Sequence, residues 1–359
     1  MLPWLANLFG AQSSLSADLV LRAVFALFTA FVVGLFVGPF MIRRLTERLI
    51  GQTVRKDGPQ THYQKAGTPT MGGVLMLFGT TVSTLLWAQL GNVDVWIALA
   101  TLLAFGAIGL ADDTIKLLRK NPRGIGARAK FAWQTAASVV SALAVFLTAK
   151  GPAETVFHVP LLVRPVASLG IAGFTILGYL VVTGASNAVN LTDGLDGLAA
   201  VPTALVASAL GLLAYLAGSP HWAAAMYVPF VPGAGELLVF CCAMAGSALG
   251  FLWFNAYPAQ VFMGDVGALA LGGALGIVAV MIRQEILLFV MGGVFVAETV
   301  SVMLQVGSFK LTRRRIFRMA PLHHHFELKG WPESRVIVRF WIASLLLVVL
   351  GLSTLGVRI

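Results

Sequence analysis

Long apolar stretches dominate the chain, and short polar segments separate them. Ten such stretches can be marked, at 19–42, 71–90, 94–111, 130–149, 168–186, 198–217, 236–254, 267–282, 286–306 and 337–357. A helix needs roughly 20 apolar residues to cross a bilayer. A membrane barrel would alternate apolar and polar positions, whereas Val24–Phe40 is apolar on all sides. The pattern predicts an all-α polytopic membrane protein of about ten transmembrane helices, forming one domain over 1–359.

The composition supports this fold class. Hydrophobic residues make up 58% of the chain and charged residues 11%, and the mean hydropathy is +0.87. A water-soluble domain of this size could not carry so much apolar surface. Cys241 and Cys242 are adjacent within one apolar stretch, which argues against a disulfide framework.

The basic residues are distributed unevenly over the connecting segments. Twenty of the 25 Lys and Arg residues fall in the connectors after the first, third and ninth apolar stretches. By the positive-inside rule these connectors are cytoplasmic, and both termini then lie outside. The net charge of +10 is therefore explained by topology and by contact with lipid or substrate phosphate, without nucleic acid. On the outer side, Val156–Val163 could form a small periplasmic β-hairpin.

Carboxylates and amides gather where the odd-numbered stretches end. The residues concerned are Asp112, Asp113, Asn187, Asn190, Asp193, Asp196, Asn255 and Asp265. An Asp at the bilayer centre costs about 2.5–3.5 kcal/mol, so we expect these side chains to share a wet cavity at the cytoplasmic surface. Adjacent residues point about 100° apart on a helix, so Asp112 and Asp113 should serve one site only at a helix end.

Two of these segments combine carboxylates with glycines. Asp265 lies in Phe262–Gly267, and a carboxylate beside open backbone suits a Mg²⁺ ion that bridges phosphates. Asp193 and Asp196 are three residues apart, so they would share one face if this segment is helical, and Gly194 allows close approach of a ligand. Tight turns with solvated or helix-capping carboxylates are the alternative interpretation.

Two further segments have candidate ligand-binding residues. His323, His324 and His325 are consecutive, so they cannot all face one metal ion, and hydrogen bonding to phosphate or sugar suits them better. Thr70 lies in Lys65–Gly73, just before the second apolar stretch, where hydroxyls and free N–H groups favour an anion. Ordinary helix capping would explain the same residues.

In this order the motifs resemble the phospho-N-acetylmuramoyl-pentapeptide transferase family, one of the polyprenyl-phosphate N-acetylhexosamine-1-phosphate transferases. The resemblance spans nearly the whole chain and rests on Lys65–Gly73, Ala111–Asp113 with Lys116, Ala127–Lys130, Asn187–Gly197, Gly250–Gly267 and Met319–Pro332. It implies Mg²⁺, a homodimer, and an active site on the cytoplasmic face of the bacterial inner membrane. It also implies the reaction: UDP-N-acetylmuramoyl-pentapeptide and undecaprenyl phosphate give lipid I and UMP, the first membrane step of peptidoglycan synthesis.

The resemblance also implies roles for individual residues. Asp265 becomes the metal ligand, Asp112 and Asp113 the essential pair near the lipid phosphate, and Asp193 with His323, His324 and His325 further catalytic residues. The residues implied to bind substrate are Lys65, Gly194, Leu195, Asp196, Asn255 and Phe262 for uridine and Lys130 for phosphate, beside Thr70, Asn187 and Asn190 of the polar segments. Ala268 and Thr114 depart from the family pattern, which has Ser and an aromatic residue there.

Two other functions fit parts of the sequence. A sister enzyme would use UDP-N-acetylglucosamine, but the triple-histidine segment through Trp331 and Pro332 resembles the muramoyl-pentapeptide enzymes specifically. A secondary transporter would also carry intramembrane carboxylates, although it would place them near the bilayer midplane and not at one face.

Overall fold

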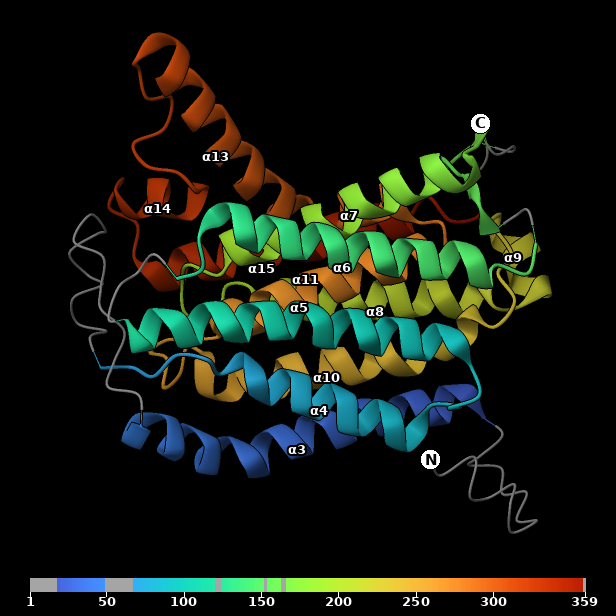
Figure 1. Ribbon diagram of the computed structural model, residues 1–359, viewed down its shortest axis with the longest axis horizontal. Coiled ribbons are helices and arrows are strands. Elements are labelled where there is room, and N and C mark those ends of the chain that lie inside the picture. The colour runs from blue at the N-terminus through green and yellow to red at the C-terminus, as the bar shows by residue number, and fades with distance from the viewer. Residues whose placement is uncertain (1–17, 49–66, 120–123, 152–153, 163–165, 358–359) are drawn as a thin grey trace.

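A computed structural model describes residues 18–48, 67–119, 124–151, 154–162 and 166–357. Most of its helices run side by side in an elongated bundle, and α13 leans away from the others (Figure 1). The long apolar helices are α3 (Leu19–Arg48), α4 (Gly73–Trp87), α5 (Val93–Leu118), α6 (Ala127–Thr148), α7 (Gly170–Thr192), α8 (Ala200–Ala217), α10 (Leu237–Asn255), α11 (Gly264–Met281), α13 (Gly293–Thr312) and α15 (Glu333–Leu352). Within the described residues, nine of them are long and apolar enough to cross a membrane, and α4, with 15 residues, is shorter.

Short elements connect these helices. They are β1 (Val156–Phe157), β2 (Ala167–Ser168), α9 (Pro220–Met226), η3 (Ala234–Glu236), α12 (Glu285–Met291) and α14 (Leu322–Glu327). Figure 1 shows α9 and α14 at opposite ends of the bundle. The chain is thus an all-α multi-pass membrane protein, as its apolar pattern predicts.

Helix α11 forms the centre of the bundle. It packs against α5, α7, α4 and α8, and nearly all of its residues after Asp265 are buried. Small residues allow this close packing, because a Cβ on Gly272 would come within 2.5 Å of the Ala185 carbonyl oxygen of α7. The central helix therefore fixes the positions of its neighbours, and Asp265 lies in its first turn.

Three local predictions need correction. The ninth apolar stretch is broken at Gly292 into α12 and α13, because Gly292 does not continue the helical conformation. The strand that pairs with β1 is Ala167–Ser168, beyond the predicted Val156–Val163, so the hairpin has a longer loop. Helix α5 continues to Leu118 and does not end at Asp113.

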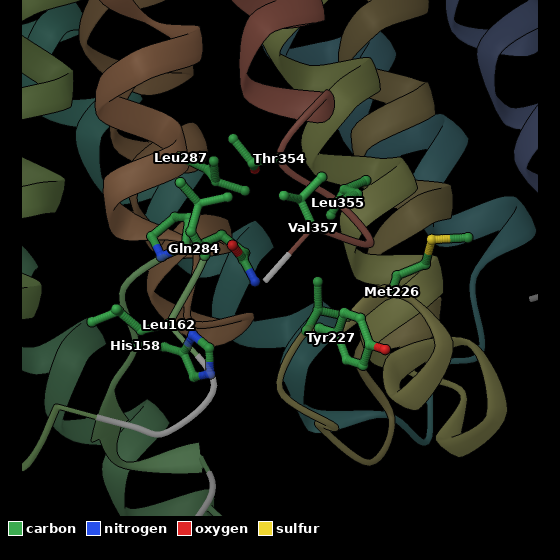
Figure 2. Close-up of a pocket in the computed structure, with 12 residues that line it drawn as sticks. His158, Leu162, Met226, Tyr227, Gln284, Leu287, Thr354, Leu355 and Val357 are labelled. Carbon is green, nitrogen blue, oxygen red and sulfur yellow. The ribbon is translucent and has the colours of Figure 1, made fainter. Parts of the chain in front are cut away.

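The α9 end of the bundle contains a small pocket. It is lined by His158 and Leu162 of the β1–β2 loop, Tyr227 after α9, Gln284 after α11 and Thr354 after α15, among others (Figure 2). None of its lining residues is a carboxylate. The acidic residues of the sequence motifs lie at the other end of α11.

Candidate active site

Three carboxylates from α5 and α11 meet at the start of α11. Oxygen atoms of Asp112, Asp113 and Asp265 all lie within 4.8 Å of one another, a spacing that could hold a metal ion. Asp112 and Asp113 are almost fully buried, and Asp265 is partly exposed. The predicted convergence of the carboxylates of α5 and α11 is therefore present in the structure.

The two carboxylates of α5 converge although they lie inside the helix. Asp113 Oδ2 accepts a hydrogen bond of 3.2 Å from the Val266 N–H of α11, while Asp112 Oδ1 accepts one of 2.7 Å from the Ile125 N–H on the other side. The expectation that both could serve one site only at a helix end is wrong. The backbone before α6 binds Asp112 and the backbone of α11 binds Asp113. Both carboxylates can therefore belong to one cluster although adjacent side chains on a helix point about 100° apart.

Two ammonium groups lie among these carboxylates. Lys116 Nζ is 2.7 Å from Asp112 Oδ2, 3.3 Å from Asp113 Oδ1 and 2.9 Å from Asp265 Oδ2. Lys130 Nζ of α6 is 2.5 Å from Asp265 Oδ2 and 3.4 Å from Asp112 Oδ2. The cluster thus holds two ammonium groups against its three carboxylates.

The two asparagines of α7 have different surroundings. The Asn190 side chain donates to Asp265 Oδ1 at 2.9 Å, so it belongs to the carboxylate cluster. Asn187 instead exchanges hydrogen bonds with buried Gln134 of α6, and it donates to the Thr183 carbonyl of its own helix. The structure therefore brings Asn190 to the cluster, whereas the Asn187 amide holds α6 against α7.

Asp193, the first residue after α7, lies close to the carboxylate cluster. Burial and the negative charges of Asp265, Asp113 and Asp196 together raise the pKa of Asp193 to about 8. Its carboxyl group therefore lies within electrostatic reach of the cluster.

Two of the predicted uridine residues, Asp196 and Asn255, hydrogen-bond around the turn after α7. Asp196 Oδ2 accepts from the Ala259 N–H at 2.9 Å, and Asn255 accepts from the Gly197 N–H at 3.0 Å and donates to the Val261 carbonyl at 2.8 Å. These side chains join the turn to the segment before α11. Leu195 is buried in a separate apolar cluster with residues of α15.

The segment before α4 is tied to the same place by its backbone. The N–H groups of Gly72 and Gly73 donate to the carbonyls of Phe262 and Met263, each at 2.8 Å. The expectation of free N–H groups at this helix start is therefore wrong for these two amides, because the backbone before α11 occupies them. The Thr70 hydroxyl is buried with no hydrogen-bond partner among the described residues, and Lys65 lies outside those residues.

The three histidines have three different environments. His323 is 1% exposed and packs on Gly194, where a Cβ would overlap its Nε2. His324 pairs with Glu327 at 2.7 Å through Nδ1, and His325 Nδ1 accepts a hydrogen bond from the Arg318 N–H. Among the three histidines, His323 is the one that packs on Gly194, in the turn after α7.

Two residues of the site were given no role in the sequence analysis. Lys116 follows Asp112 by four residues and Asp113 by three, a spacing that places side chains on one helix face and could have revealed it. Glu298 is a lone carboxylate within an apolar stretch, which is itself a sign of function. It lies 3.3 Å from His323 Nδ1.

The donor set fits a hard divalent cation. All three side chains offer carboxylate oxygens, which Mg²⁺ prefers, and the two lysine ammonium groups already occupy the space between them as cations. Asp112, Asp113 and Asp265 are the residues that would hold such an ion. The predicted single ligand, Asp265, is thus accompanied by two more candidates.

Fold and cluster define a multi-pass membrane protein with an acidic and basic centre at one end of its bundle. The family model of glycosyl transferase family 4 matches residues 95–283, which is more than half of the chain. The first signature of the phospho-N-acetylmuramoyl-pentapeptide-transferases matches residues 65–77, the segment tied to the start of α11. The chain belongs to glycosyl transferase family 4, within the superfamily of polyprenyl-phosphate hexosamine-1-phosphate transferases.

Membership of this family gives a coarse function. The chain is a phospho-sugar transferase of the phospho-N-acetylmuramoyl-pentapeptide-transferase type, in a family of divalent-metal-dependent enzymes that use a nucleotide-sugar donor and a polyprenyl phosphate acceptor. The transporter alternative is set aside by this finding.

Proposed function

We propose that the chain transfers phospho-N-acetylmuramoyl-pentapeptide from its UDP donor to undecaprenyl phosphate, giving lipid I and UMP. The observation that carries the proposal is the meeting of Asp112, Asp113 and Asp265 with Lys116 and Lys130. The negative charge of a diphosphate must be neutralised during transfer, and the signature segment is hydrogen-bonded to the backbone just before Asp265. We further propose one transferase domain, Mg²⁺ as the cation, a homodimer, and a site facing the cytoplasm from the inner membrane.

Phosphoryl transfer requires mainly positioning and charge neutralisation from the protein. The lipid phosphate is mostly a dianion at neutral pH, because the second pKa of a phosphate monoester is near 6. Its oxygen attacks the β-phosphorus of the donor; the bond from that phosphorus to the bridging oxygen breaks, and UMP leaves with the electron pair. Asp112 orients the attacking phosphate, and a bound Mg²⁺ would neutralise charge on the diphosphate.

The lysines and asparagine complete this arrangement. Lys116 and Lys130 are close enough to Asp265 to contact phosphates held beside it. Asn190 donates to Asp265 Oδ1 and so fixes the direction in which the other oxygen points. We propose that Gly194, Leu195, Asp196, Asn255 and Phe262, with Lys65, form the uridine side, and that Thr70 and Asn187 line the substrate path.

Purified protein with Mg²⁺, undecaprenyl phosphate and either UDP-N-acetylmuramoyl-pentapeptide or UDP-N-acetylglucosamine tests the proposal. We expect UMP release and lipid product with the first donor only. Turnover of the second donor alone would assign the sister activity, and no product from either would overturn the transferase assignment. Trapping a phosphorylated aspartate on the wild type would replace direct attack by a two-step route.

A further inference from the structure

A buried glutamate in α13 has a defined set of contacts near the candidate site. Glu298 is 0% exposed and lies in the second turn of α13. A carboxylate within an apolar helix is costly unless hydrogen bonds or a counter-charge compensate it. The hydrogen-bond partners of Glu298 therefore indicate its role.

Those partners are at the start of α14. The N–H of Leu322 donates to Glu298 Oε2 at 2.6 Å, and the N–H of His323 donates to Oε1 at 3.2 Å. Both amides belong to the first turn of the helix, where N–H groups have no partner within the helix itself. Glu298 thus holds the backbone that carries the three histidines.

The same carboxylate also faces the ring of His323. Its Oε1 lies 3.3 Å from Nδ1, at ion-pair distance, and among the described residues neither ring nitrogen has a hydrogen-bond partner although both are buried. On its other side the ring packs on Gly194, next to Asp193. The ring is therefore held between Glu298 and the turn that borders the carboxylate cluster.

We propose that Glu298 is a positioning residue that fixes the tautomer and direction of His323. A carboxylate beside Nδ1 favours the tautomer that carries its proton on Nδ1. The unprotonated Nε2 then faces the Asp193–Gly194 side of the site. The transfer role of His323 rests on the proposed function, whereas the tautomer does not.

A double-mutant cycle tests the coupling. Glu298→Gln keeps the size of the side chain and removes its charge, and we expect kcat to fall about 10- to 100-fold with little change in KM for the donor. His323→Asn should lower kcat by a similar factor or more. If Glu298 acts through His323, the double variant is no slower than His323→Asn alone. Multiplying effects would overturn the proposal.

Gln305 provides a matched control on the same helix. Its side chain accepts from the N–H groups of Ile316 and Phe317 and donates to the Phe317 carbonyl, so it also holds the segment after α13. None of these hydrogen bonds among the described residues involves a histidine. Any effect of Gln305→Ala should multiply with that of His323→Asn. Non-additivity there as well would show general loosening of the segment, and Glu298 would then have no specific role.

The tautomer can be read without turnover. In histidine-¹⁵N-labelled protein in lipid, assigned with His323→Asn, we expect a His323 signal with the proton on Nδ1 in the wild type and a redistribution in Glu298→Gln. Identical His323 signals in both proteins would overturn the proposal, even if the wild type proved inactive. Inactivity of the wild type with a changed His323 signal would instead overturn only the proposed function.

Discussion

At the scale of single residues, the site is defined by the crowding of like charges and the cations that compensate it. Asp265 contacts Lys116, Lys130 and Asn190 at once. Asp112 also contacts both lysines, and Asp113 contacts Lys116. Removing the charge of Asp265 therefore disturbs both lysines and Asn190 at once.

Asp265→Asn should lower turnover at least about 100-fold, because electrostatic groups at a reacting centre commonly contribute this much. UMP release under saturating donor measures it. Asp94→Asn is the control, since Asp94 lies at the start of α5, at the other end of that helix, and should retain turnover. Near-normal activity of Asp265→Asn would remove Asp265 from the metal role.

Lys130→Met should strengthen divalent-cation binding in the absence of donor while weakening catalysis. The ammonium competes with a cation for Asp265 and Asp112, so its loss should lower the dissociation constant at least about fivefold. Titration with Mn²⁺ measures this directly. Arg128→Met, on the exposed first turn of α6, removes the same charge without touching the carboxylates and should leave the constant unchanged. Equal shifts in both variants would point to general surface charge.

Because the pKa of Asp193 is raised, we expect the stability of the protein without metal or donor to depend on pH. Its pKa of about 8 in the folded protein exceeds the unfolded value of about 3.9, so between these values the folded state binds a proton that the unfolded state lacks. The free energy of unfolding should fall as pH rises through this window. Thermal unfolding from pH 5 to 9 in a chelator should show a steeper fall for the wild type than for Asp193→Asn; parallel curves would contradict it.

At the scale of elements, the site depends on close approaches of backbone to the ends of helices. The segment before α4 bonds to the segment before α11, and the segment before α6 bonds to Asp112 of α5. These contacts bring the starts of three helices together around one cluster, so changes in the connecting backbone should affect activity as strongly as changes in the side chains.

Gly124 and Gly126 form a matched pair for this prediction. Gly124 has a φ of +52° and its Cβ would overlap Asp112 Oδ1, whereas a Cβ on Gly126 would meet nothing within 4 Å. Gly124→Ala should cost about 1–2 kcal/mol of stability through backbone strain and lower kcat/KM at least about tenfold through Asp112. Gly126→Ala should behave like the wild type in both unfolding and turnover. Equal behaviour of the two variants would contradict a backbone contact with Asp112.

At the scale of the whole molecule, the two ends of the bundle have different tasks. One end holds the carboxylates and lysines, and the other is closed by a buried ion pair between Arg22 of α3 and Glu236 of η3. Arg22 also donates to the carbonyl of Trp87, the last residue of α4, and Glu236 accepts from the Gln89 N–H. This pair joins three segments at the end remote from Asp265.

Glu236→Gln should therefore lower stability and leave the chemistry intact. Breaking a buried pair by changing one partner costs about 3–5 kcal/mol, because the remaining charge stays buried. Unfolding in a detergent series measures the loss, and kcat per folded molecule should stay within about twofold of the wild type. A large fall in kcat at unchanged fold would show that the two ends are coupled.

The sequence by itself determined the all-α membrane fold, the ten apolar stretches and the segments that carry the polar residues. These properties are local, since the length and composition of a stretch of chain decide whether it crosses a bilayer. Tertiary structure alone decided which polar groups meet. Asn190 hydrogen-bonds to Asp265 while Asn187 pairs with Gln134, although both asparagines belong to the same motif on α7.

The same dependence on tertiary structure explains why the sequence analysis gave Glu298 and Lys116 no role. It also explains why the amides before α4 were expected to be free. Each depends on a partner far away in sequence, His323, Asp265 or Phe262, and on the packing of separate helices around α11. Such contacts are set by how small residues let helices approach one another, and the hydropathy of a single stretch does not contain that information.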